Sequence, residues 1–196
     1  MKAPFLKRLF AYIIDMIIIS TLVTLICAAI PSKNNSTEEE LRKLSEALIE
    51  KKIDNNEYID KYTDLMYQNN KNERVTLSIT VVLTIAYFVI FQYMNKGQTI
   101  GKKLLNLRVV DNETKKEISI LKGLLRSILP LNIISSVIAV ALIKILTKNV
   151  YINLYLGANT IESIFIFVTM FLILYRKDGR GLHDMMANTI VVTEKR

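Results

Sequence analysis

Apolar residues along this chain are gathered into four long blocks, which are separated by segments rich in charge. The blocks cover residues 9–30, 75–94, 127–146 and 157–175. About 20 residues of α-helix, rising about 1.5 Å each, cross the ~30 Å hydrocarbon core of a bilayer. The pattern therefore predicts an all-α integral membrane protein, built as a bundle of four transmembrane helices whose partner is the lipid bilayer.

The first block carries a single acidic side chain, Asp15, and Arg8 precedes it by two helical turns. An acidic group at the centre of a membrane helix costs about 2.5–3.5 kcal/mol, so it normally faces protein or water and has a function. Asp15 is therefore either a group that exchanges protons or cations, or a hydrogen-bonding partner that joins helices. Both interpretations need polar neighbours at a similar depth. The side chains expected there are Gln92, Asn132, Thr169 and Tyr175.

The distribution of charge predicts the orientation of these helices. Basic residues predominate at the N-terminus, in the loop 95–126 and in the tail 176–196, whereas residues 33–74 carry more acidic than basic side chains. Loops rich in Lys and Arg stay in the cytoplasm. Both termini and the basic loop are therefore expected inside the cell, and residues 33–74 outside it.

The segments between the apolar blocks have patterns of their own. In residues 33–74, leucines and tyrosines recur at helical intervals on both sides of residues 54–56, which predicts an extracytoplasmic insertion of two short helices. Residues 107–110 and 189–193 are rich in β-branched side chains, and we expect them to form a small cytoplasmic β pair. Ser119 is expected to cap an amphipathic helix.

Composition argues against several classes of function. The formal net charge is +8, but the basic residues flank apolar blocks and form no groove-facing helix, so no nucleic acid is expected as a partner. The chain has one cysteine, Cys27, and one histidine, His183, and neither belongs to a cluster of metal-ligating residue types. We therefore expect no metal site, no cofactor, no catalytic residue and no enzyme activity.

Three stretches follow one another in the chain: FLKRLFAYIID, GQTIGKKLLNLRVVD and RGLHDMMANTIVV. Together they resemble the RDD family of bacterial membrane proteins, which is named for one arginine and two aspartates. In these stretches the arginine corresponds to Arg8 and the aspartates to Asp15 and Asp184. The resemblance implies a multi-spanning protein of the bacterial inner membrane that is suspected of transport, in some members of cation or sodium–proton exchange.

Arg8 and Asp184 both lie at the predicted cytoplasmic boundary. We expect them to form an ion pair that holds the tail against the first helix, with Arg126 nearby as a second cation. In the alternative interpretation, Arg8 is only a positive-inside anchor and Asp184 is an exposed acid of the tail.

Two hypotheses of function follow from these patterns. In the first, the protein is a transporter or a component of ion exchange, which moves protons or monovalent cations with Asp15 as its buried ionisable group. Because four helices enclose little space, this hypothesis also predicts a homo-oligomer. In the second, the protein is a structural or regulatory membrane module that docks partner proteins and transports nothing.

Overall fold

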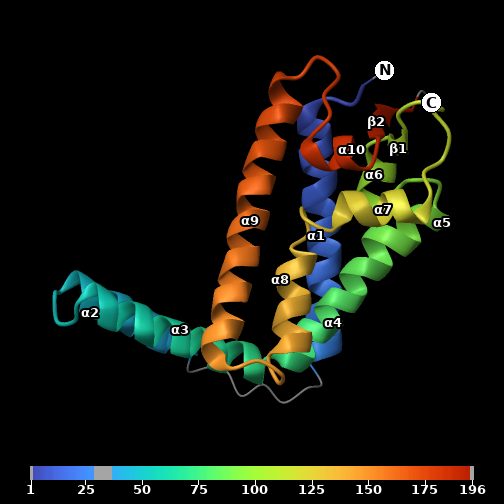
Figure 1. The fold of residues 1–196 in the computed structure, drawn as a ribbon. Helices are drawn as coiled ribbons and strands as arrows, with labels where there is room; N and C mark the ends of the chain where they lie inside the picture. The colour runs from blue at the N-terminus through green and yellow to red at the C-terminus, as the bar shows by residue number, and fades with distance from the viewer. Residues whose placement is uncertain (1, 29–36, 195–196) are drawn as a thin grey trace.

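The structure is a computed structural model that describes residues 2–28 and 37–194. Helices α1 (Phe5–Cys27) and α9 (Lys148–Tyr175) run along the length of the molecule (Figure 1). A third helix, Arg74–Met94, is inclined against α1 (Figure 1). Among the described residues, these three helices are long and apolar enough to cross a membrane.

Three predictions fall partly on residues that the structure does not describe. These are the end of the first span (residues 29–30), the start of the helical insertion (residues 33–36) and the end of the tail (residues 195–196).

The third long helix changes its geometry along its length. It begins as α4 (Arg74–Ile85), widens to the π-helical η1 (Ala86–Phe91) and ends as α5 (Gln92–Met94). Tyr87 and Phe88 of η1 pack against α1 through Ile19. Short π-helical turns inside α-helices frequently lie at functional sites. Here the wide turn lies beside Asp15, to which the hydroxyl of Tyr87 donates a hydrogen bond.

The apolar block at residues 127–146 does not form a long helix, which corrects the prediction of a fourth full-length span. Helix α7 (Ile120–Ser127) ends first, and a separate apolar helix, Ile133–Leu142, follows it as α8 (Ile133–Val137) and η2 (Ile138–Leu142). At about 1.5 Å per residue, Ile133–Leu142 rises about 15 Å, roughly half of the hydrocarbon thickness.

The break between α7 and α8 has two causes in the sequence. Pro130 has no backbone N–H to donate within a helix. Asn132 has a φ of 52°, in the left-handed region, so a right-handed helix cannot continue through it. The last long helix, α9, in turn begins at Lys148 and not at residue 157.

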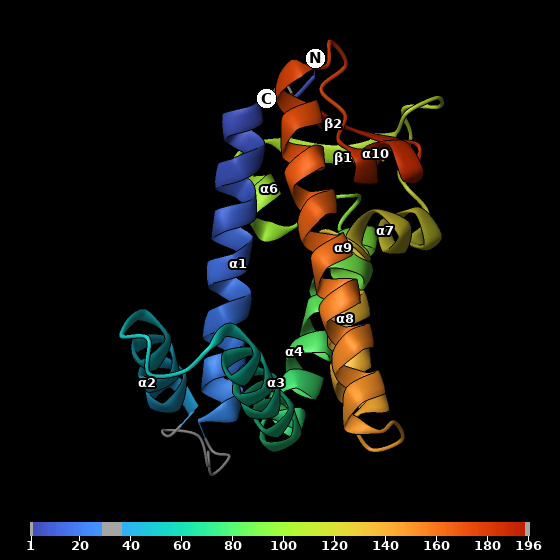
Figure 2. The ribbon, with the colours of Figure 1, turned by 60° about the vertical axis from the view of Figure 1, so that its left-hand side comes forward.

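Two helices lie between α1 and α4 in the chain, and the break between them falls next to residues 54–56, as the sequence predicts. They are α2 (Thr37–Ile49) and α3 (Asn55–Asn72). Asp54 caps α3, because its carboxylate accepts a hydrogen bond from the backbone N–H of Glu57 at 2.8 Å. The two helices pack against each other and project from the bundle at the end opposite the chain termini (Figures 1 and 2).

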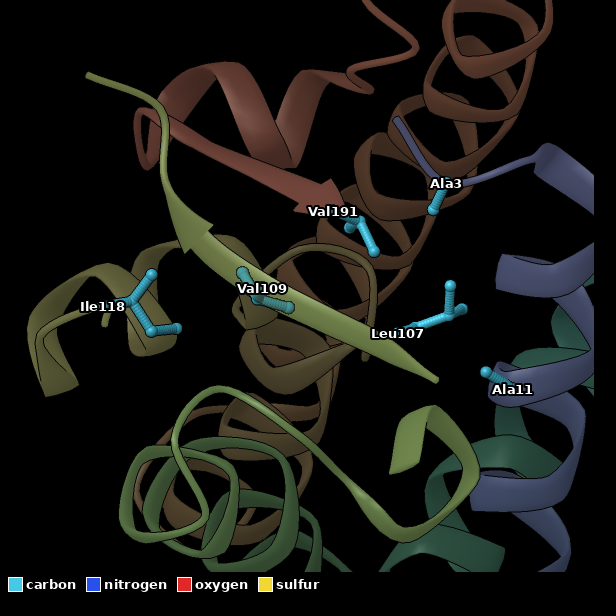
Figure 3. Close-up of a cluster of buried hydrophobic side chains, with 6 residues drawn as sticks. All are labelled: Ala3, Ala11, Leu107, Val109, Ile118 and Val191. Carbon is cyan, nitrogen blue, oxygen red and sulfur yellow. The ribbon is translucent and has the colours of Figure 1, made fainter. Parts of the chain in front are cut away.

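The other end of the bundle carries the predicted β pair, which is confirmed. Strand β1 (Leu107–Asp111) runs antiparallel to β2 (Thr189–Thr193). The backbone N–H of Ala3 donates to the carbonyl of Val191 at 3.0 Å, so the N-terminal segment joins the same sheet. A small apolar cluster packs there, made of Ala3, Ala11, Leu107, Val109, Ile118 and Val191 (Figure 3).

Candidate functional site

Asp15 of α1 is buried, with 1% of its surface exposed. Its carboxylate accepts three hydrogen bonds, from the hydroxyl of Tyr87 at 2.6 Å, the hydroxyl of Thr99 at 2.5 Å and the backbone N–H of Gly101 at 2.7 Å. Tyr87 belongs to η1, whereas Thr99 and Gly101 lie at the start of a short helix, α6 (Ile100–Leu104). The carboxylate therefore joins three segments of the chain.

Helix α6 reaches the Asp15 carboxylate because Gly101 has no side chain. A Cβ atom at Gly101 would lie 2.3 Å from the carbonyl oxygen of Ala11 and 2.9 Å from Oδ1 of Asp15. Thr99 caps the helix, since its hydroxyl accepts from the backbone N–H of Lys102 at 3.4 Å. The free N–H groups at a helix start favour a negative group, which is what Asp15 supplies.

Two of the polar residues expected around Asp15 make other contacts. Gln92 Oε1 accepts from the Lys102 ammonium at 2.6 Å, and the backbone carbonyl of Asn132 accepts from the hydroxyl of Ser136 at 2.6 Å. In the described part of the chain, neither residue hydrogen-bonds to Asp15. The loop 95–126 was predicted to lie outside the helical bundle, and its residues were therefore not expected to contact Asp15. Its first part instead folds back along α1 and forms α6.

The second aspartate, Asp184, is fully buried in α10 (Leu182–Met186). The ion pair expected from the sequence is present: Arg8 Nη2 donates to Oδ2 of Asp184 at 2.5 Å, and Arg126 Nη1 lies 3.2 Å from Oδ1. Burial acts to raise the pKa of Asp184, but the neighbouring His183, Arg126 and Arg8 bring it well below its usual range. Asp184 is therefore ionised, and its carboxylate pairs with both arginines.

A third buried carboxylate, Glu162 of α9, was not among the predicted site residues. Its Oε1 accepts from the backbone N–H of Ile134 at 2.8 Å, and its Oε2 from that of Ser135 at 3.3 Å. Glu162 therefore satisfies the first turn of α8 where this helix restarts after the break. The sequence signal was a lone acidic residue within a long apolar helix.

A cleft of about 220 Å³ lies between α1 and α9. Four of the predicted site residues line it, namely Arg8, Asp15, Gln92 and Arg126. Asp184 does not line the cleft, but it forms ion pairs with the two arginines that do. Asn132 does not line the cleft. Lys102, which is not among the predicted site residues, adds a third cation to the lining.

Three buried polar atoms of side chains that line the cleft have no hydrogen-bond partner in the described part of the protein. They are Gln92 Nε2, Thr169 Oγ1 and His183 Nδ1. Gln92 is 2% exposed and Thr169 is 5% exposed. A buried polar group without a partner costs about 1–3 kcal/mol, and such groups are uncommon in native proteins.

Burial also changes the titration of two basic side chains at the cleft. It lowers the pKa of Lys102 to about 7, with a further lowering by Arg126. It lowers the pKa of His183 to about 3, so this imidazole is neutral at neutral pH. Nε2 of His183 lies 3.4 Å from the Asp184 carboxylate, which favours the tautomer with its hydrogen on Nε2 and leaves Nδ1 as an acceptor.

The model of the RDD family matches residues 2–188. The chain belongs to the RDD family. No curated protein and no solved structure matches it. The matched range includes α2 and α3, and it includes the arginine and both aspartates. In this RDD protein the three residues form two separate clusters: Arg8 pairs with Asp184, and Asp15 holds the start of α6.

Proposed function

We propose that this RDD protein is a component of membrane transport that binds an ionic solute in the cleft between α1 and α9. The observation that carries the proposal is the gathering of charged side chains and unpartnered polar atoms in one cleft among apolar helices. Ionisable groups at membrane depth are costly, and they typically mark the path of a solute or an ion.

The orientation expected from the charge distribution predicts on which side of the membrane this cleft lies. With both termini in the cytoplasm, the β pair, α6, α10 and the cleft lie toward the cytoplasmic face of a bacterial inner membrane. The helix pair α2–α3 then lies outside the cell. A homo-oligomer would supply the further helices needed to enclose a path.

Exchange of protons or monovalent cations is the form of transport that Asp15 would serve. A carboxylate has about four acceptor sites, and the three hydrogen bonds to Asp15 leave one of them for a proton or a cation. Because Asp15 lines the cleft, a solute bound in the cleft would change the charge and the hydration around the Asp15 carboxylate.

A second function, a module that docks partner proteins, is favoured by one observation. Helices α2 and α3 project from the bundle and carry ion pairs on their exposed surface, such as Arg42 with Glu39 and Lys61 with Glu57. A module of this kind would need Asp15 only to hold α6 against α1.

Flux measurements separate the two functions. The purified protein is reconstituted in liposomes that contain a pH-sensitive dye, and a sodium or potassium gradient is imposed. Proton movement that depends on the gradient is expected for the wild type, is lost in Asp15→Asn and persists in Asp60→Asn, a matched change at an exposed position of α3. Absence of flux in folded wild-type protein, together with stable copurification of a partner, would instead favour the docking module.

A further inference from the structure

The three unpartnered atoms define what the cleft can bind. Gln92 Nε2 is a donor, and the hydroxyl of Thr169 can donate or accept. His183 Nδ1 is an acceptor, because the favoured tautomer has its hydrogen on Nε2. A ligand that satisfies all three must offer acceptor oxygens and at least one hydrogen-bond donor, such as a hydroxyl group.

The charges around the cleft favour an anion. Arg8, Lys102 and Arg126 line it, and the carboxylates next to them are Asp15 and Asp184. Three positive groups against two negative ones leave one net positive charge while Lys102 is protonated. Both oxygens of each carboxylate already accept hydrogen bonds, whereas a guanidinium has five N–H donors and an ammonium three. More donor positions than acceptor positions are therefore left over, which favours a ligand with negatively charged oxygen atoms.

The rest of the cleft is apolar and opens sideways. Phe88, Leu131 and Ile173 line its interior. Tyr12 of α1 and Met170 of α9 line it as well, and each is 42% exposed on the surface that faces lipid in a spanning bundle. Within the described residues, α1 packs mainly against α6 and α4, and α9 against α8 and α10, so the two helices leave a lateral opening between them.

We propose that the cleft binds an anionic phospholipid. Its phosphate accepts from Arg126, Lys102 and the amide of Gln92, a hydroxyl of its headgroup donates to His183 Nδ1, and its acyl chains lie between α1 and α9. The inference rests on the proposed function only in using the same cleft: the lipid is an anionic ligand held there beside the proton or cation that Asp15 would exchange. A soluble phosphate ester offers the same oxygens and hydroxyls, but it leaves the apolar part of the cleft unfilled.

Calorimetric titration of the detergent-purified protein distinguishes these ligands. The probes are dioctanoyl phosphatidylglycerol, dioctanoyl phosphatidylcholine and glycerol 3-phosphate. We expect the phosphatidylglycerol to bind at least tenfold more tightly than the other two. Thr169→Val and Gln92→Glu should each weaken its binding about tenfold, the first by removing a hydrogen bond and the second by adding a negative charge. Thr80→Val, a matched change in α4 away from the cleft, should leave the affinity unchanged.

Thr169→Val also controls for folding. The hydroxyl of Thr169 has no partner among residues 2–28 and 37–194, and valine keeps the shape of the side chain, so the unfolding temperature without ligand should stay the same or rise. Equal affinity for phosphatidylglycerol and phosphatidylcholine, or full affinity in Thr169→Val, would overturn the proposal. Tight binding of glycerol 3-phosphate would assign the cleft to a soluble phosphate ester and overturn the lipid.

The binding assay is independent of the flux assay. Selective binding of phosphatidylglycerol by a protein that shows no flux would overturn transport and leave the lipid site standing. Flux by a protein that does not select phosphatidylglycerol would overturn the lipid site and leave transport standing.

Discussion

The backbone N–H of Gly101 donates a hydrogen bond to the Asp15 carboxylate at 2.7 Å, although 86 residues separate the two in the chain. This bond fixes α6 against α1 and closes one wall of the cleft. It requires a residue without a side chain at position 101, because the carbonyl of Ala11 lies 2.3 Å from where a Cβ would be.

Gly101→Ala should therefore destabilise the protein. The added methyl group forces α6 away from α1, at a cost of about 1–3 kcal/mol, which is typical of overpacking. Thermal unfolding in detergent measures the effect. The control is Gly157→Ala in α9, where a Cβ meets nothing within 4 Å and alanine should be neutral or stabilise the helix by about 0.5–1 kcal/mol. Equal stability of the two variants would show that α6 does not pack on α1 in this way.

The Arg8–Asp184 pair makes a different prediction. Asp184→Asn leaves the buried Arg126 and the partly buried Arg8 without their carboxylate, and removal of one partner from a buried ion pair costs about 3–5 kcal/mol. Arg8→Gln should cost less, because Arg126 remains with Asp184. In a double-mutant cycle read by thermal unfolding, the double variant should lose less stability than the sum of the single variants.

An exposed ion pair provides the reference for that cycle. Arg42→Gln removes contacts with Glu39 and Glu46 on the surface of α2, and it should leave the unfolding temperature almost unchanged, because water screens exposed ion pairs. Additive effects of the two changes at Arg8 and Asp184 would contradict an energetic coupling between them.

The lowered pKa of Lys102 predicts how stability depends on pH. The group has a pKa of about 7 in the folded protein and its ordinary, higher value in the unfolded chain, so unfolding takes up a proton between those values. Stability without ligand should therefore rise as the pH rises from 7 to 9. In Lys102→Met this rise should be smaller, whereas Lys103→Met, at the exposed neighbouring position, should keep it.

The same ammonium faces several charged or titratable groups, namely Arg126 of α7, Arg8 and Asp15 of α1, and Asp184 and His183 of α10. Both His183 and Asp184 titrate well below pH 7, so they do not contribute to a change between pH 7 and 9. An identical pH profile for the wild type and Lys102→Met, by unfolding temperature, would show that Lys102 keeps its ordinary pKa.

Glu162 offers a test of hydrogen bonding against ionisation. Glu162→Leu leaves the N–H groups at the start of α8 without an acceptor, which should cost about 1–3 kcal/mol. Glu162→Gln keeps one acceptor oxygen and should cost clearly less. If thermal unfolding shows that both variants lose the same stability, the negative charge of Glu162 matters more than its hydrogen bonds.

Much of the scaffold could be predicted because its signals are local. Long apolar runs, each with at most one acidic residue, give α1, the helix Arg74–Met94 and residues 157–175 of α9, and runs of β-branched residues give the two strands. The Arg8–Asp184 contact was within reach because both residues belong to the motifs of the family and lie at the same end of the bundle.

The partners of Asp15 could not be predicted in the same way. The sequence GQTIGKK has the composition of a polar loop, and nothing local shows that it folds back along α1. Only the close approach of Gly101 to Ala11, a tertiary contact, brings Thr99 and the α6 N–H groups to the carboxylate. The expected depths of residues on separate helices therefore pointed to Gln92 and Asn132, neither of which hydrogen-bonds to Asp15 in the described part of the chain.

The long sequence separation of these contacts has a consequence for biosynthesis. Helix α1 leaves the ribosome with Arg8 and Asp15 unpaired, and Asp184 follows Arg8 by 176 residues. Until α6 is made, Asp15 has none of its α6 donors, and until β2 is made, the N-terminal segment has no strand to join. The contacts of α1 can therefore be completed only after the tail that carries α10 and β2 has been made.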